Sequence, residues 1–126
     1  MMVGVAGALC LLLAGGHTLV GRSVLPAFRK QPLPASSLGG PATTAIALTV
    51  TWYFVTIAVT GLAVLLLALA GRHGSAERSL VLRTVSGVFT AAAVLTVWLA
   101  RRRPRRLLRS PVAGFIAVAA LCAVSA

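Results

Sequence analysis

Residues 42–70 read ATTAIALTVTWYFVTIAVTGLAVLLLALA, a run of 29 residues without one charged side chain. As an α-helix the run would be about 44 Å long, whereas a hydrocarbon core about 30 Å thick needs only about 20 helical residues. We therefore expect it to cross a membrane, either tilted or extending past the core. Trp52 and Tyr53 favour an extension, because such rings prefer the headgroup level.

The rest of the chain has the same character. It has 126 residues, of which 59% are hydrophobic and only 10% charged. A soluble domain carries about 25% charged residues, and a chain with so few could not cover its apolar surface in water. The composition indicates a single membrane domain, 1–126, with no separate soluble domain.

Three further apolar runs accompany the first. The sequence predicts an all-α fold, an integral membrane bundle of four transmembrane helices. The first run opens without a positive residue, so we expect a retained helix rather than a cleaved signal peptide. Prolines and glycines interrupt the chain between the first two runs, and Pro104 blocks a continuous helix between the last two. The predicted spans are 2–20, 46–70, 82–100 and 107–126, with loops at 21–41 and 101–109.

The charge distribution predicts an orientation. Twelve Lys and Arg residues against one acid, Glu77, give a net charge of +11. These basic residues lie between apolar runs, which is typical of the positive-inside rule and not of a nucleic-acid interface. Loops 21–41 and 101–109 carry nine of the twelve. We expect both loops to be cytoplasmic and both termini to lie outside a bacterial cytoplasmic membrane.

Small residues suggest where the helices pack. The first run is rich in glycine and alanine, including Gly15. Gly87 lies four residues before Ala91, and Ala113 lies four before Ala117. Small residues at this spacing let helix backbones approach closely in lipid. We expect them to pack the bundle, with a dimer face as the alternative, and we expect Gly15 and Gly87 to lie at close contacts.

The second run also carries a polar stripe. Four hydroxyl-bearing residues fall on one helical face at spacings of four, three and four, and His17 is the ionisable residue within the first run. An intramembrane ionisable group is a functional hypothesis, although a threonine can also bond its own backbone. We expect His17 to pack toward the second run. The candidate polar intramembrane site is His17, Thr49, Tyr53, Thr56 and Thr60.

The arginine-rich stretch RRRPRRLLR at 101–109 predicts contact with anionic phospholipids, because each basic residue near a membrane surface contributes about 1 kcal/mol of attraction. A role in topology alone is the simpler reading. The candidate lipid contacts are Arg101, Arg102, Arg103, Arg105, Arg106 and Arg109. No acid lies in a predicted span, and neither a catalytic set nor a metal-ligand cluster appears. We therefore expect no enzyme activity, no metal and no cofactor.

The stretch GGHTLVGRSVLPAF, residues 15–28, resembles a group of small bacterial four-helix membrane proteins whose functions are uncharacterised. Their first helix is rich in glycine and ends in His-x-x-x-Gly, which His17 and Gly21 match. Their second helix often begins with a Trp-His pair. Trp52 matches its first member, but Tyr53 stands in place of the second. The resemblance covers about a third of the chain and implies no activity.

The sequence thus predicts a small structural or interaction protein of the membrane, without catalysis. Two alternatives remain open. The first is a small transporter or permeation subunit that uses the threonine face of the second run. The second is an accessory subunit of a larger membrane complex. The expected partners are the bilayer, a second copy of the chain, or another membrane protein, and nucleic acid is not among them.

Overall fold

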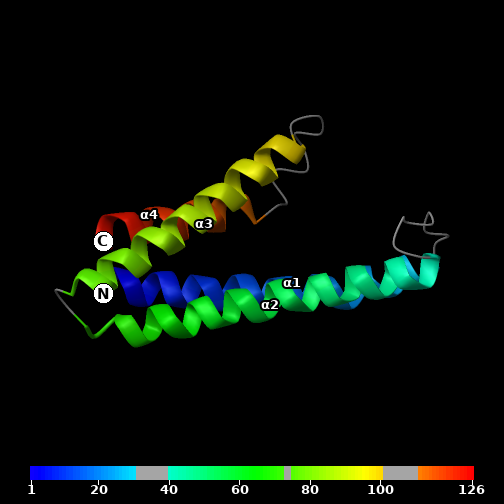
Figure 1. The fold of residues 1–126 in the computed structure, drawn as a ribbon, viewed down its shortest axis with the longest axis horizontal. Coiled ribbons are helices and arrows are strands. Elements are labelled where there is room, and N and C mark those ends of the chain that lie inside the picture. The colour runs from blue at the N-terminus through cyan, green and yellow to red at the C-terminus, as the bar shows by residue number, and fades with distance from the viewer. Residues whose placement is uncertain (31–39, 73–74, 101–110) are drawn as a thin grey trace.

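The computed structural model describes residues 1–30, 40–72, 75–100 and 111–126, and these residues fold into an all-α bundle. Its helices are α1 (Met2–Lys30), α2 (Pro41–Leu69), α3 (Ala76–Ala100) and α4 (Val112–Ser125). The helices form two antiparallel hairpins, α1–α2 and α3–α4, and α4 lies against α1 (Figure 1). Both chain ends lie at the same end of the bundle (Figure 1).

Three of the four helices are long and apolar enough to cross a membrane: α1, α2 and α3. Helix α4 has 14 residues and would be about 21 Å long, which is shorter than the core. Within the described residues, α4 is therefore too short to form the complete fourth transmembrane span that the sequence predicted. The first four positions of that span, 107–110, lie outside them.

The predicted loop 21–41 is wrong in its first ten residues, because α1 continues to Lys30 with Pro26 inside it. Proline removes one backbone hydrogen bond, so the sequence favoured an earlier end. Packing against α2 outweighs that loss: Gly21 is buried, and Leu25 is only 8% exposed. Residues 31–39 lie outside the described residues.

Helices α2 and α3 begin earlier than expected, and local signals account for both. Pro41 occupies the first turn of α2, where its missing N–H is harmless. At α3, the Arg78 backbone N–H donates to Ser75 Oγ at 3.1 Å, so Ser75 caps the helix. Glu77 lies in the first turn, where a negative charge complements the helix dipole.

The core lies in the half of the bundle that holds the chain ends, and all four helices contribute to it. Cys10 of α1 and Cys122 of α4 are both fully buried and unpaired. They behave as small hydrophobic residues. The outer surface is apolar, and Phe54 and Ile57 are 68% and 69% exposed. Such a surface suits lipid and not water.

Gly15 and Gly87 do not make the close contacts that the sequence predicted. A Cβ atom at Gly15 or Gly87 would meet nothing within 4 Å, so both predictions are wrong. The close contacts instead involve Gly7, against Leu67, and Gly114, whose Cβ would lie 2.8 Å from Leu13 Cδ2. The third close contact, at Gly21, belongs to the site described next.

Candidate functional site

His17 lies on α1 and faces α2, as the sequence predicted. Its Nε2 atom is 3.3 Å from the carbonyl oxygen of Trp52, and the indole Nε1–H of Trp52 donates to the carbonyl oxygen of His17 at 3.2 Å. The two rings are stacked, with centroids 4.1 Å apart and an interplanar angle of 11°. The pair therefore joins α1 and α2 by two reciprocal hydrogen bonds and one ring stack.

The hydrogen bond assigns the histidine tautomer. A carbonyl oxygen only accepts hydrogen bonds, so the Nε2 atom of His17 must carry the proton. In the neutral ring Nδ1 then keeps a lone pair. The Nε2–H of His17 is thus paired with a carbonyl oxygen of α2, and this avoids the cost of an unpaired donor in an apolar medium.

Gly21 makes this arrangement possible. It lies four residues after His17, on the same face of α1, and it is buried. A Cβ atom at this position would overlap Trp52 Nε1 and would lie 3.0 Å from Cδ1 and 3.1 Å from Cε2 of the same ring. The indole therefore occupies the space that a side chain at position 21 would need.

The polar stripe of α2 is only partly assembled with His17. The Thr56 hydroxyl donates to the carbonyl oxygen of Trp52 at 3.3 Å, the same oxygen that His17 contacts. Thr49 and Thr60 donate in the same way to carbonyl oxygens four residues earlier in α2, those of Ala45 and Thr56, each at 2.8 Å. Tyr53 is 53% exposed. Thr56 is thus the member of the stripe that the structure brings together with His17.

A cavity of about 440 Å³ lies beside this pair, between α1, α2 and the beginning of α4. Its lining is almost wholly apolar, with His17, Trp52 and Thr56 as the polar exceptions. The lining residues are Leu12, Leu13, Ala14, Gly16, His17, Val20, Trp52, Val55, Thr56, Val59, Pro111 and Phe115. A cavity of this kind has room for an apolar group that carries one hydrogen-bonding end.

The rise per residue of an α-helix gives the distance of the His17–Trp52 pair from the end of the bundle that holds the chain ends. His17 lies about 23 Å along α1 from Met2, and Trp52 lies about 26 Å along α2 from Leu69. If the core begins at the end of the bundle that holds the chain ends, the pair lies just inside its far boundary. Arg22 then reaches the headgroup level, and the described parts of α1 and α2 beyond it extend past the core.

Two polar contacts were not predicted from the sequence. The Arg78 guanidinium donates to the carbonyl oxygen of Ser125 at 2.9 Å, and a cation there complements the C-terminal end of α4. The Ser86 hydroxyl donates to the carbonyl oxygen of Ala119 at 3.0 Å, which joins α3 to α4. No sequence signal marks either contact, because each depends on which helix lies opposite.

The predicted lipid-contact arginines at 101–109 lie outside the described residues. Among the residues that the structure does describe, no three His, Cys, Asp or Glu side chains come together as a group able to hold a metal ion.

Comparison with protein-family models, with curated proteins and with solved structures finds no significant match to this chain. The resemblance based on His17, Gly21 and Trp52 therefore stays a prediction from the sequence. What the structure adds is a physical role for the three residues, since they form one contact between α1 and α2.

Proposed function

We propose that this chain is a small structural or interaction protein of the bacterial cytoplasmic membrane, and that it works by contact with another membrane helix and not by catalysis. The observation that carries the proposal is the position of α2. This helix packs along α1 and has few contacts with α3. One long side of it is therefore available to a partner.

The free side of α2 is continuous. Its large apolar residues recur at spacings of four, four, three and seven, which keeps them on one helical face. Their exposed fractions lie between 60% and 69%, and they are Ile46, Val50, Phe54, Ile57 and Val64. Gly61 lies on the same face with open space where a Cβ would be. A glycine within an apolar face allows a second helix to approach closely.

A role in permeation is less well supported. The hydroxyls of Thr49, Thr56 and Thr60 are bonded to carbonyl oxygens of α2 itself. A threonine bonded in this way is tolerated in lipid without lining a polar path. An accessory subunit of a larger complex would use the same free face of α2, so that alternative differs only in the identity of the partner.

Site-specific photo-crosslinking in living cells tests the proposal. A photoreactive amino acid at position 61 should give a discrete adduct of higher mass, because that position faces the partner. The matched control is position 87, another helical glycine with open space around it. An adduct of twice the chain mass would identify a second copy, and any other mass a different membrane protein. Lipid adducts alone at position 61 would contradict the proposal.

We also propose that both termini lie outside and that segments 21–41 and 101–109 are cytoplasmic. The bias of nine basic residues against three supports this orientation. The shared location of the two chain ends (Figure 1) agrees with an even number of crossings. A phosphatase fused after Ala126 should be active, and a fluorescent protein fused there should be dark. The reverse pattern would show that the orientation is inverted.

Replacing the arginines at 101–106 with asparagine should weaken this bias, because they supply five of the nine charges. The same fusions would then report a mixed orientation. Replacing Arg72 alone is the control and should leave the orientation of the unaltered chain unchanged.

A further inference from the structure

The cavity of about 440 Å³ beside His17 has a polar end and an apolar end. Its lining runs from Leu12 to Val20 on α1 and from Trp52 to Val59 on α2, which corresponds to about 11–12 Å of helix. His17 and Trp52 lie toward the near boundary of the hydrocarbon core, whereas Leu12 and Val59 lie deeper in it. A small amphiphile in a membrane orients in the same way, with its polar end at the boundary.

The hydrogen bonds at the polar end leave acceptors free and use the side-chain donors. The Nε2–H of His17 and the hydroxyl of Thr56 both point to the carbonyl oxygen of Trp52, and the indole N–H of Trp52 donates to the carbonyl oxygen of His17. Each of these side chains has one proton to donate in its neutral form. None of the described lining residues is charged. The cavity therefore favours a neutral occupant that itself donates a hydrogen bond.

The Nδ1 atom of His17 is the acceptor that such an occupant would meet. Within the described part of the chain this atom has no hydrogen-bond partner, and the buried side-chain polar atom left unpaired there is Arg78 Nε. Nδ1 is therefore unpaired without being buried, on a ring that lines the cavity. An imidazole nitrogen is basic near neutral pH and accepts more strongly than the hydroxyl of Thr56.

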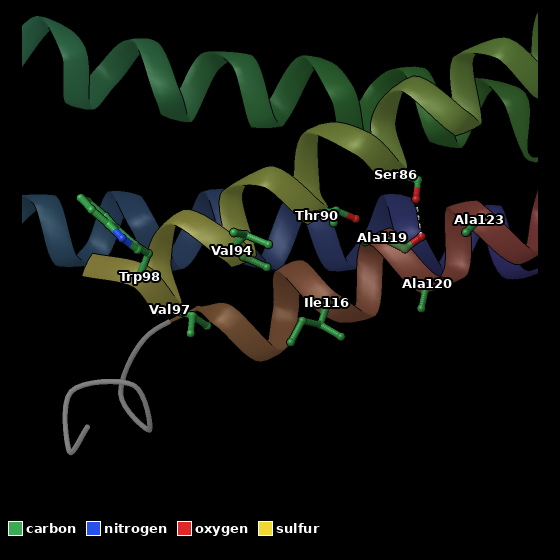
Figure 2. A pocket seen from close by; sticks show the side chains of 10 residues that line it. Ser86, Thr90, Val94, Val97, Trp98, Ile116, Ala119, Ala120 and Ala123 are labelled. Carbon is green, nitrogen blue, oxygen red and sulfur yellow. Dashed lines mark hydrogen bonds between the residues drawn. The ribbon is translucent and has the colours of Figure 1, made fainter. Parts of the chain in front are cut away.

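A larger groove, of about 680 Å³, lies on the outer side of the α3–α4 hairpin, and Figure 2 shows the side chains that line it. Its described lining holds neither a histidine nor a charged residue, and its Ser86 hydroxyl is bonded to the Ala119 carbonyl oxygen. That lining favours no single class of apolar occupant. The cavity beside His17 differs because its free acceptor distinguishes hydroxyl-bearing ligands from ethers and ketones.

The size and walls of the cavity indicate an aromatic ring with a short tail. A cavity of about 150 Å³ is enough to bind benzene, so about 440 Å³ leaves room for a ring and several further carbon atoms. His17, Trp52 and Phe115 bring three rings to the lining, and rings favour stacked or edge-to-face contacts with one another. Leu12 is 72% exposed and Val20 is 52% exposed, so the cavity opens toward the lipid.

We propose that this cavity binds a lipophilic phenol, an aromatic ring that carries one hydroxyl group and a short hydrocarbon tail. The hydroxyl donates to Nδ1 of His17, and the tail lies toward Leu12 and Val59. A phenolic lipid of the bilayer and a small phenol that enters from outside both belong to this class. The site does not include the free face of α2, and it stands or falls independently of the proposed interaction role.

Tryptophan fluorescence tests the proposal with two matched ligands. The chain has two tryptophans, so Trp98→Phe leaves Trp52 as the single reporter. The ligands are 4-propylphenol and its methyl ether, 4-propylanisole, with each concentration expressed as a mole fraction in neutral detergent. We expect the phenol to half-saturate the Trp52 response at about a fivefold lower mole fraction, because only the phenol can donate a hydrogen bond. Equal half-saturation by the two ligands would overturn the proposal.

Two neighbouring glycines separate binding in this cavity from binding elsewhere. A Cβ atom at Gly15 or at Gly16 would meet nothing within 4 Å, so a leucine fits at either position. Of the two, Gly16 lines the cavity. Gly16→Leu should therefore abolish the saturable response to 4-propylphenol, and the matched control Gly15→Leu should keep it. The same response in both variants would place the ligand elsewhere and contradict the site.

His17→Phe tests the acceptor, because it keeps a ring beside Trp52 and removes Nδ1. This variant should bind 4-propylphenol and 4-propylanisole equally, whereas the control Thr56→Val should keep the preference for the phenol. An unchanged preference in folded His17→Phe would overturn the assignment of Nδ1. If circular dichroism shows that His17→Phe does not fold, Gly16→Leu decides the case, since it leaves the His17–Trp52 contact intact.

Mass spectrometry of the unaltered chain, purified from its membrane, identifies the source of the ligand. A retained phenolic lipid would show that the bilayer supplies it. Binding of added 4-propylphenol without any retained phenolic lipid would show that the ligand enters from outside. A retained lipid that carries no hydroxyl donor, and that 4-propylphenol does not displace, would contradict the proposal.

Discussion

Replacing Gly21 with leucine should lower the stability of the folded bundle by about 2–3 kcal/mol, because overpacking at a close contact costs roughly that much. The new side chain would enter the space that the Trp52 indole occupies. That ring cannot easily move aside, since it is stacked on His17 and bonded to the His17 carbonyl oxygen. Thermal melting in a mild detergent, followed by circular dichroism, measures the change.

The control for this experiment is Gly15→Leu. It lies on the same helix, six residues away, and a Cβ there meets nothing within 4 Å. Both variants gain the same intrinsic helix propensity, so the difference between them isolates the contact with Trp52. Similar melting temperatures for the two variants would show that Gly21 does not lie against the indole.

The second large effect is expected at Trp52. Trp52→Ala should destabilise the bundle by about 3 kcal/mol, because it removes the ring stack, the indole hydrogen bond and the packing against Gly21. Trp52→Phe keeps an aromatic ring and should cost only about 1 kcal/mol, the typical value of one hydrogen bond. Phe54→Ala is the control, since Phe54 is 68% exposed on the same helix.

A double-mutant cycle shows whether the loss of stability in Trp52→Ala depends on the contact between Trp52 and His17. His17→Ala and Trp52→Ala should be coupled by about 1 kcal/mol, because stacked rings contribute roughly that much beyond their buried area. Additive effects would mean that the two rings do not interact. Equal losses for Trp52→Ala and Phe54→Ala would mean that the contact between α1 and α2 does not depend on the indole.

For His17, the sequence predicted the neighbouring helix but not the residue that it contacts. An imidazole in an apolar run needs a polar partner, so its position against α2 could be predicted. Its partner could not be identified, because α2 offers hydroxyls, rings and carbonyl oxygens at many positions. The spacing of Gly21 four residues after His17 was the available signal. Its meaning depends on Trp52, which the sequence places only at the membrane surface.

The glycines show the same limit in packing. In water, the polar side of a helix shows which side faces the core. In lipid the outer surface is as apolar as the core, so the pattern does not reveal the rotation of the helix. Gly15 and Gly87 have the spacing and chemistry of packing residues, yet both face open space. Gly21 and Gly114 lie at contacts because of the residues that happen to oppose them.

The amino-acid sequence was enough to predict the all-α class, the number of helices and the approximate place of each, because apolar runs of about 20 residues satisfy their backbone groups in lipid by forming helices. It misplaced the end of α1, where packing against α2 overrides Pro26. The faces by which the helices meet could be identified only from the folded bundle. These contacts rest on the fit of particular side chains, such as the Trp52 indole over Gly21, and not on hydropathy.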